Sequence, residues 1–186
     1  MRNYLLSSVL LFISLNIQSQ SNEWLVGLSG SFVKFDASNL TNSELYNFQF
    51  PRLNLSRCIS PEFSLDAAIT FSTFEPKGIK NEFDYFSFDM NVIYNFNLSD
   101  KKLVPYLGIG GTIVGATKTI QYLKPMLGLN IVSGGTLWLS SNWGLNSQIG
   151  YKFTPRNKEI LNKHFQLTAG IVYSFSSSFN RRGCRM

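Results

Sequence analysis

The sequence predicts an all-β fold, an eight-stranded antiparallel up-and-down transmembrane β-barrel. Apolar and polar residues alternate through most of the chain. Charged residues make up 15% of it, against an average of about 25%, and aromatic residues another 15%. After the first 20 residues, no apolar run reaches the length of about 20 residues that a membrane-spanning helix needs. A membrane barrel shows this pattern because successive side chains of a strand point to opposite faces.

The first 20 residues are typical of a secretory signal peptide. Arg2 gives a positive start, an apolar stretch runs from Tyr4 to Leu15, and small or polar residues follow as far as Gln20. The alternative is an uncleaved anchor, for which the apolar stretch is short. We therefore expect a signal peptide at residues 1–20, a barrel domain at residues 21–175 and a flexible periplasmic tail at residues 176–186.

Four strands are expected in the first half of the barrel domain. Residues 24–32 place Trp24 and Phe32 on one face and Ser29 and Ser31 on the other. Residues 48–59 alternate except at Pro51, which cannot donate to a strand ladder and therefore predicts a bulge or edge distortion. Every odd position is apolar in residues 63–71, and every even position in residues 86–96.

Four more strands are expected in the second half. Residues 104–113 alternate large aliphatic side chains with Gly and Thr, and residues 127–139 place leucines opposite Gly, Asn and Thr. Residues 143–153 begin on Trp143 and end on Phe153. Residues 164–175 are apolar at every odd position, over a length that matches a tilted bilayer crossing of about 9–11 residues.

The connections between these segments alternate in length. Short polar turns are expected at residues 60–62, 98–102 and 140–142, and loops of about ten residues at the other four connections. Short periplasmic turns and longer outer loops are typical of bacterial outer-membrane barrels, and they place both termini in the periplasm. The sheet must close, because an open edge in lipid leaves backbone groups unpaired.

A soluble barrel of lipocalin type, with its apolar face inward, is the alternative architecture. Alternation alone does not assign the two faces, but the apolar face here is almost free of charge and the polar face is rich in small residues. Aromatic residues also gather at the segment ends, as in an interfacial girdle. On one rim we expect Trp24, Phe96, Trp143, Tyr173 and Phe175, and on the other Phe32, Phe71, Phe86, Phe153 and Phe165.

Three stretches resemble the small outer-membrane barrels of OmpA, OmpX and OmpW type. They are residues 105–110 (PYLGIG), residues 143–153 after a polar turn, and the closing residues 170–175 (GIVYSF). The resemblance implies this fold and a place in a Gram-negative outer membrane. Our interpretation of the sequence is a porin-like, monomeric, non-enzymatic protein that acts through its surface loops. The OmpW-type resemblance implies, as the alternative, a narrow conduit for small apolar molecules. One departure is that 11 residues follow Phe175.

An enzymatic role is the third interpretation. Some outer-membrane barrels resemble lipid A deacylases, which use a His-x-Ser pair, but the single His of this chain stands in His164-Phe165-Gln166. A Ser–His enzyme needs its base within reach of the hydroxyl. No cofactor or metal is expected either, because one His and two distant Cys do not make a ligand set.

Polar residues that fall on lumen positions form the first candidate site. Single buried charges are costly, so these side chains should pair with one another or reach water. Two interpretations remain open: a plug that fills the barrel, and a gate across a narrow path. The expected lumen network consists of Arg52, Asp66, Asp89, Asn91, Asn130, Gln148, Lys152 and Gln166.

Basic loop residues and the cysteines complete the expectations. The net charge of +6 is scattered, which argues against nucleic acid and leaves outer-membrane lipids and lipopolysaccharide as partners. Loops of this kind could also bind an extracellular or periplasmic protein partner. Cys58 and Cys184 both fall on the periplasmic side, where a disulfide would tie the tail to the barrel. Two interpretations remain open for the basic residues in or beside the later loops, which are solvated loop charges or contacts to lipid A phosphates: Lys118, Lys124, Arg156, Lys158 and Lys163.

Overall fold

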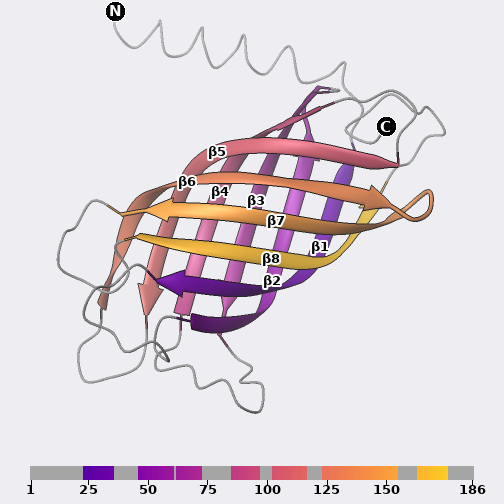
Figure 1. The fold of residues 1–186 in the computed structure, drawn as a ribbon. Helices are drawn as coiled ribbons and strands as arrows, with labels where there is room; N and C mark the ends of the chain where they lie inside the picture. Colours follow the sequence, from indigo (N-terminus) through magenta and orange to yellow (C-terminus); the bar gives the residue numbers. More distant parts are fainter. Residues whose placement is uncertain are drawn as a thin grey trace, which may run out of the picture.

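The structure is a computed structural model that describes residues 23–35, 46–60, 62–72, 85–96, 102–116, 123–154 and 163–175. In these residues it has eight strands, each hydrogen-bonded to the next in the sequence, and β8 returns to β1 to close the barrel. Every pairing between two of these strands is antiparallel. The predicted fold class is therefore confirmed (Figure 1).

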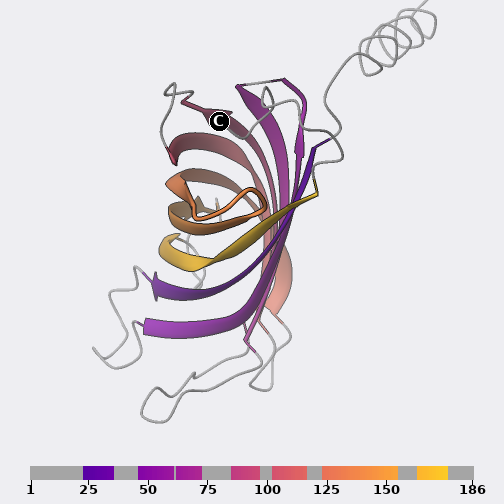
Figure 2. The ribbon, with the colours of Figure 1, turned by 90° about the vertical axis from the view of Figure 1, so that its right-hand side faces the viewer.

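The strands follow the predicted segments closely and extend beyond several of them. They are β1 (Trp24–Phe35), β2 (Tyr46–Cys58), β3 (Phe63–Phe71), β4 (Tyr85–Asn95), β5 (Leu103–Ala116), β6 (Leu123–Trp138), β7 (Trp143–Phe153) and β8 (Lys163–Phe175). Figure 2 shows how the tilted strands curve into one continuous wall. No helix within the described residues is long and apolar enough to span a membrane.

One predicted connection is wrong. The loop between the fifth and sixth strands is not about ten residues long, since β5 continues to Ala116 and β6 begins at Leu123. The alternation ends earlier in the sequence because the pairing register shifts between Val114 and Ala116. A bulge of this kind extends a ladder past the point where simple alternation stops.

The bulge predicted at Pro51 is present. Ser29 pairs with Arg52, and Ser31 pairs with Gln49. Between these two pairs, β2 therefore contains one more residue than β1. The Phe50–Pro51 peptide bond is cis. Because of the extra residue, Gln49 and Arg52 both point into the barrel, although three positions separate them. The irregularity therefore places the guanidinium of Arg52 inside.

The two faces of the wall have opposite chemistry. Inward-pointing side chains are mostly polar and buried, whereas large apolar side chains point outward and are exposed, up to 73% at Leu127. This distribution is the reverse of a lipocalin-type barrel, whose apolar face points inward. The loop end of the barrel is the end at which β1, β3, β5 and β7 finish, and the turn end is the end at which they begin.

Candidate functional site

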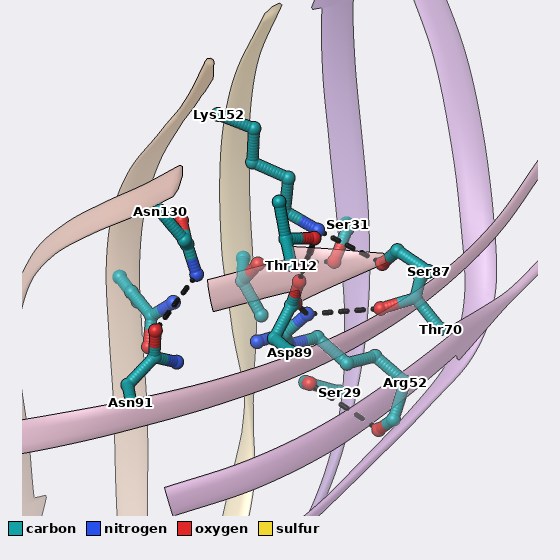
Figure 3. A network of polar contacts seen from close by, with 12 residues as sticks. Ser29, Ser31, Arg52, Thr70, Ser87, Asp89, Asn91, Thr112, Asn130 and Lys152 are labelled. Atoms are coloured by element: carbon teal, nitrogen blue, oxygen red, sulfur yellow. Dashed lines mark hydrogen bonds and ion pairs between the residues drawn. The ribbon is translucent and has the colours of Figure 1, made fainter. Parts of the chain in front are cut away.

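A carboxylate held by two cations lies in the middle of the lumen. Asp89 of β4 accepts a hydrogen bond from Arg52 Nη1 of β2 at 2.8 Å and forms an ion pair with Lys152 Nζ of β7 at 2.8 Å. Thr112 donates to the same carboxylate at 2.6 Å, and Arg52 Nη1 also donates to Thr70 at 2.9 Å. Figure 3 shows these side chains meeting from different sides of the barrel. Arg52, Asp89 and Lys152 together form the charged centre of the lumen.

The alternation of each strand explains why these side chains meet. Asp89 lies among even-numbered apolar residues of β4, so its odd position points inward, and Lys152 has the equivalent place in β7. All three charged side chains are almost fully buried, with Asp89 at 0% exposure. Burying an isolated charge costs several kcal/mol, which here is offset by ion pairs and hydrogen bonds to one carboxylate.

A second group of hydrogen bonds continues from the charged centre toward the loop end. Lys152 Nζ donates to Ser87 at 2.8 Å and to the Tyr85 hydroxyl at 3.3 Å. The same hydroxyl lies 2.8 Å from His164 Nε2. His164 and Tyr85 are both buried, and their rings meet edge to face with centroids 5.6 Å apart. The loop-side half of the lumen is therefore filled with buried side chains, several of which are hydrogen-bonded to one another.

The half of the lumen nearer the turn end is hollow. A cavity of about 70 Å³ lies there, on the turn side of Arg52, and Asp66 and Asn54 line one wall of it. On the other wall Asn146 Nδ2 donates to the Tyr106 hydroxyl at 3.0 Å. A volume of this size holds a few water molecules, since one needs about 10–15 Å³. The apolar part of the lining is formed by Leu25, Ile93, Val104, Trp138 and Val172.

The expected lumen network divides into separate groups. Arg52, Asp89 and Lys152 form the charged centre, and beside it Asn130 Nδ2 donates to Asn91 Oδ1 at 3.0 Å. Asp66 and Gln148 line the turn-side cavity instead, where Asp66 accepts a hydrogen bond from Ser56 and Gln148 accepts one from Tyr106. Gln166 is buried, and its Nε2 has no hydrogen-bond partner among the described residues.

Sequence reasoning missed several members of this interior. Tyr85 lies one residue before the expected start of the fourth strand, and His164 has the pattern of an ordinary polar residue near a loop. Thr70, Ser87 and Thr112 share the polar face of their strands, but nothing in the sequence joins them to Asp89. The signal available in the sequence was parity, which places these side chains on the inward face but does not give the height of each one in the barrel.

The basic residues expected to contact lipid A are only partly described. Lys163 begins β8 on the outer face, and its ammonium lies 5.4 Å from the centroid of the Phe153 ring. Lys124 belongs to β6. The other three, Lys118, Arg156 and Lys158, lie outside the described residues. The outer rim also holds Lys34, which sequence reasoning did not select, 5.7 Å from the Tyr46 ring centroid.

Cys58 lies at the turn end of β2, as the sequence predicts. It is buried and is not a free thiol. Cys184 and the rest of the expected tail lie outside the described residues, as does the expected signal peptide. Within the described ranges, no group of three or more His, Cys, Asp and Glu side chains is arranged to hold a metal ion.

The barrel is similar to solved outer-membrane barrels. Neisserial surface protein A shares 18% identity with it, at a TM-score of 0.59 over 81% of this chain and 96% of that one. The N-terminal β-barrel domain of Pseudomonas aeruginosa OprF shares 11%, at 0.62 over 83% and 98%. E. coli outer membrane protein W shares 11%, at 0.52 over 84% and 100%. No protein-family profile and no curated relative matches the sequence.

These likenesses establish the fold. The sequence-based resemblance to the small outer-membrane barrels is confirmed at that level, because the eight strands of this chain and those of the solved barrels superpose over most of their lengths. At identities of 11–18% the comparison carries no functional residue from one chain to another. Function must therefore be argued from this chain's own surfaces.

Proposed function

We propose that this protein is an integral, monomeric outer-membrane barrel without enzymatic activity, which acts as a structural or interaction protein through its surface loops. The observation that carries the proposal is the combination of an apolar exterior with a polar, plugged interior. Contiguous apolar surface of this extent is not left exposed to water by soluble proteins. The closed ladder also leaves no strand edge to be satisfied inside a bilayer.

Two features support placing the loop end outside the cell. The turns at residues 59–62 and 139–142 are tight. Each contains a serine, Ser60 or Ser140, whose hydroxyl accepts a hydrogen bond from the first backbone N–H of the following strand. The connections at residues 36–45 and 72–84 are the longest. Short periplasmic turns and longer outer loops are the usual arrangement, with both termini in the periplasm.

Heat-modifiability in isolated outer membranes is the test. The mature protein is run unboiled and boiled on a denaturing gel, beside a soluble periplasmic marker from the same cells. We expect it in the membrane fraction, with a band that shifts on boiling because the closed barrel resists the detergent. If the protein is found in the soluble fraction and its band does not shift, the proposal is contradicted and the soluble lipocalin-type barrel is favoured instead.

A second candidate function is a gated narrow conduit, favoured by the cavity on the turn side. The cavity stops at Arg52, so the charged centre separates it from the loop end. The lining combines polar side chains with five apolar ones, so it suits water as well as the small apolar molecules of the OmpW-type alternative. Planar-bilayer conductance separates the two functions: a plug leaves wild type silent, whereas a gate gives openings that change when Asp89 is replaced by Asn.

An enzymatic role has less support. The lipid A of cells that overexpress the protein is analysed by mass spectrometry, with cells that express an unrelated outer-membrane barrel as the control. We expect an unchanged acyl pattern. A lost or added acyl chain that depends on His164 contradicts the non-enzymatic proposal.

A further inference from the structure

The turn-side cavity extends to the end of the barrel. Asn95 and Trp138 are the last residues of β4 and β6, and both are part of its lining. Cys58 has the equivalent place at the end of β2, and it pairs with Ser64, which also lines the cavity. Asn95, Trp138 and Cys58 are 8%, 6% and 3% exposed, so this end of the cavity, which we call the mouth, is narrow. A short segment of chain is therefore enough to close it.

The side chain of Cys58 points into the mouth and is already bonded. It has the inward parity of Ser56, whereas Arg57 lies on the outer face against the Trp24 ring. Cys58 is disulfide-bonded, and the chain contains two cysteines, Cys58 and Cys184. Within one chain, the partner of Cys58 is therefore Cys184.

The geometry of a disulfide restricts where this partner can lie. The Cβ atoms of two bonded cysteines are about 3.5–4.5 Å apart, and their Cα atoms about 4.4–6.8 Å. The Cβ atom of Cys58 points inward from the end of β2. A bond to it therefore requires the backbone at Cys184 to lie over the mouth, because a position beside the outer wall is too far from the inward sulfur.

The chain between β8 and Cys184 is long enough to reach the mouth. β8 ends at Phe175, which pairs with Trp24 of β1, and Trp24 pairs with Arg57 of β2. The end of β8 is thus two strand spacings, about 10 Å, from the neighbour of Cys58. Cys184 follows Phe175 by nine residues, which span up to about 30 Å when extended. This segment can cross the mouth before it reaches Cys58.

The charges of this segment and of the mouth are opposite in sign. Residues 176–186 contain three arginines and no acidic residue. At the turn end, Asp66 lines the cavity, and Glu23 and Glu62 directly precede β1 and β3. Lys102, directly before β5, offsets one of these three negative charges. A basic segment is therefore attracted to the mouth.

Asp66 is within reach of a basic side chain beside the tether. Cys58 pairs with Ser64, and Asp66 follows Ser64 by two residues in β3. The Cα atoms of Cys58 and Asp66 are therefore about 7–8 Å apart, as for other diagonal neighbours. Arg185 is adjacent to Cys184 in the sequence, and its side chain is long enough to cover this distance. Among the described residues, the Asp66 carboxylate has a hydrogen bond but no ion pair, so an arginine would give it a counter-ion.

We propose that residues 176–186 dock across the mouth of this chain's own barrel, tethered by a Cys58–Cys184 disulfide, and close the turn-side cavity. The bond forms by thiol–disulfide exchange, in which the two thiols give up two protons and two electrons and the disulfide of an oxidising periplasmic protein is reduced to two thiols. A dithiol reductant reverses the exchange and releases the segment. The proposal rests on the proposed function only for its compartment, because disulfides persist in the periplasm.

Disulfide mapping is the first part of the test. The mature protein is purified from outer membranes with free thiols blocked, digested without reductant and analysed by mass spectrometry. We expect one pair of peptides, joined through Cys58 and Cys184. Free thiols at both positions, or a covalent dimer on a non-reducing gel, overturn the proposal.

Hydroxyl-radical footprinting then measures access to the cavity. The radical is close to water in size, and Tyr106 is a reactive aromatic side chain in the cavity lining. Oxidation of Tyr106 should be at least about fivefold faster in C58S/C184S than in wild type, because the docked segment loses the high effective concentration that a tether provides. Oxidation of Tyr85, buried in the loop-side half, should not change. Equal oxidation of Tyr106 in the two proteins overturns closure by this segment.

A relocated tether provides the matched control. C58S/S64C places the thiol on β3 but keeps it inward at the mouth, whereas C58S/R57C places it on the outer face of β2. Disulfide mapping identifies the new bond to Cys184 in each variant. We expect C58S/S64C to protect Tyr106 as well as wild type does, and C58S/R57C to leave it unprotected. Protection in both variants, or in neither, overturns the proposal.

Heat-modifiability of every variant is measured in parallel. It reports on the membrane barrel of the proposed function and is independent of the tether. A variant that keeps its gel shift but loses protection of Tyr106 therefore locates the change at the mouth. Loss of the shift in wild type itself contradicts the membrane barrel, whatever the footprinting shows.

Discussion

The two halves of the lumen are lined by the same eight strands but have different interiors. On the loop side, Asp89 gathers Arg52 and Lys152 into a network that continues through Tyr85 to His164. On the turn side, Asp66 lines a cavity and accepts a hydrogen bond from Ser56. A carboxylate on an inward position can therefore serve as the anchor of a buried ion cluster or line a cavity. The difference between the halves lies in how many partners reach each acid.

The largest expected effect comes from removing the shared anion. Asp89→Asn leaves Arg52 and Lys152 buried without a counter-ion, which should lower the free energy of unfolding by about 3–5 kcal/mol. Urea unfolding in lipid bilayers or detergent, followed by the heat-dependent gel shift, measures it. As a control, Lys152→Met in the Asp89→Asn background should recover part of the loss, because one uncompensated cation is then removed. No recovery would mean that the cations are not coupled through Asp89.

A glycine pair tests how tightly the central wall is packed on its two faces. A Cβ atom added at inward-facing Gly110 would lie 1.8 Å from the backbone oxygen of Met90, whereas one at outward-facing Gly111 would have its nearest neighbour at 4.0 Å. We expect Gly110→Ala to cost about 1–3 kcal/mol and Gly111→Ala to change stability by less than about 0.5 kcal/mol. The same unfolding assay compares the two neighbours. Equal losses of unfolding free energy in the two variants would show that the backbone around Gly110 can shift to make room for the added methyl group.

Two tyrosines allow the two halves of the lumen to be compared by removing a single hydroxyl group from each half. Tyr85→Phe removes the partner of Lys152 and His164 in the packed half, and we expect it to cost about 1–3 kcal/mol. Tyr106→Phe removes a hydroxyl whose partners, Asn146 and Gln148, line the cavity and can turn to water, so about 0.5–1.5 kcal/mol is expected. Unfolding midpoints of the two variants, measured side by side, give the order. A larger loss at Tyr106 would contradict it.

The fold was predictable from the sequence because apolar and polar residues alternate along each strand, and this alternation shows which face of the strand is apolar. Parity placed Arg52, Asp89 and Lys152 inside, and Pro51 marked the bulge. Parity does not give the height at which two inward residues meet, since that depends on the stagger accumulated around the barrel. For this reason the meeting of Lys152 with Tyr85, and the separation of Asp66 from the charged centre, were not predictable.

Asp66→Asn gives the smallest expected effect and is the most direct test of the difference between the halves. The amide is isosteric with the carboxylate and can still accept the hydrogen bond of Ser56, while water in the cavity solvates the remaining polar atoms. We expect the free energy of unfolding to fall by less than about 1 kcal/mol, several times less than for Asp89→Asn. Both variants remove one negative charge from an inward position, so the net charge of the lumen changes equally. If Asp66→Asn nevertheless costs as much as Asp89→Asn, net charge and not local partners sets the stability of the interior, and the two halves act as one electrostatic unit.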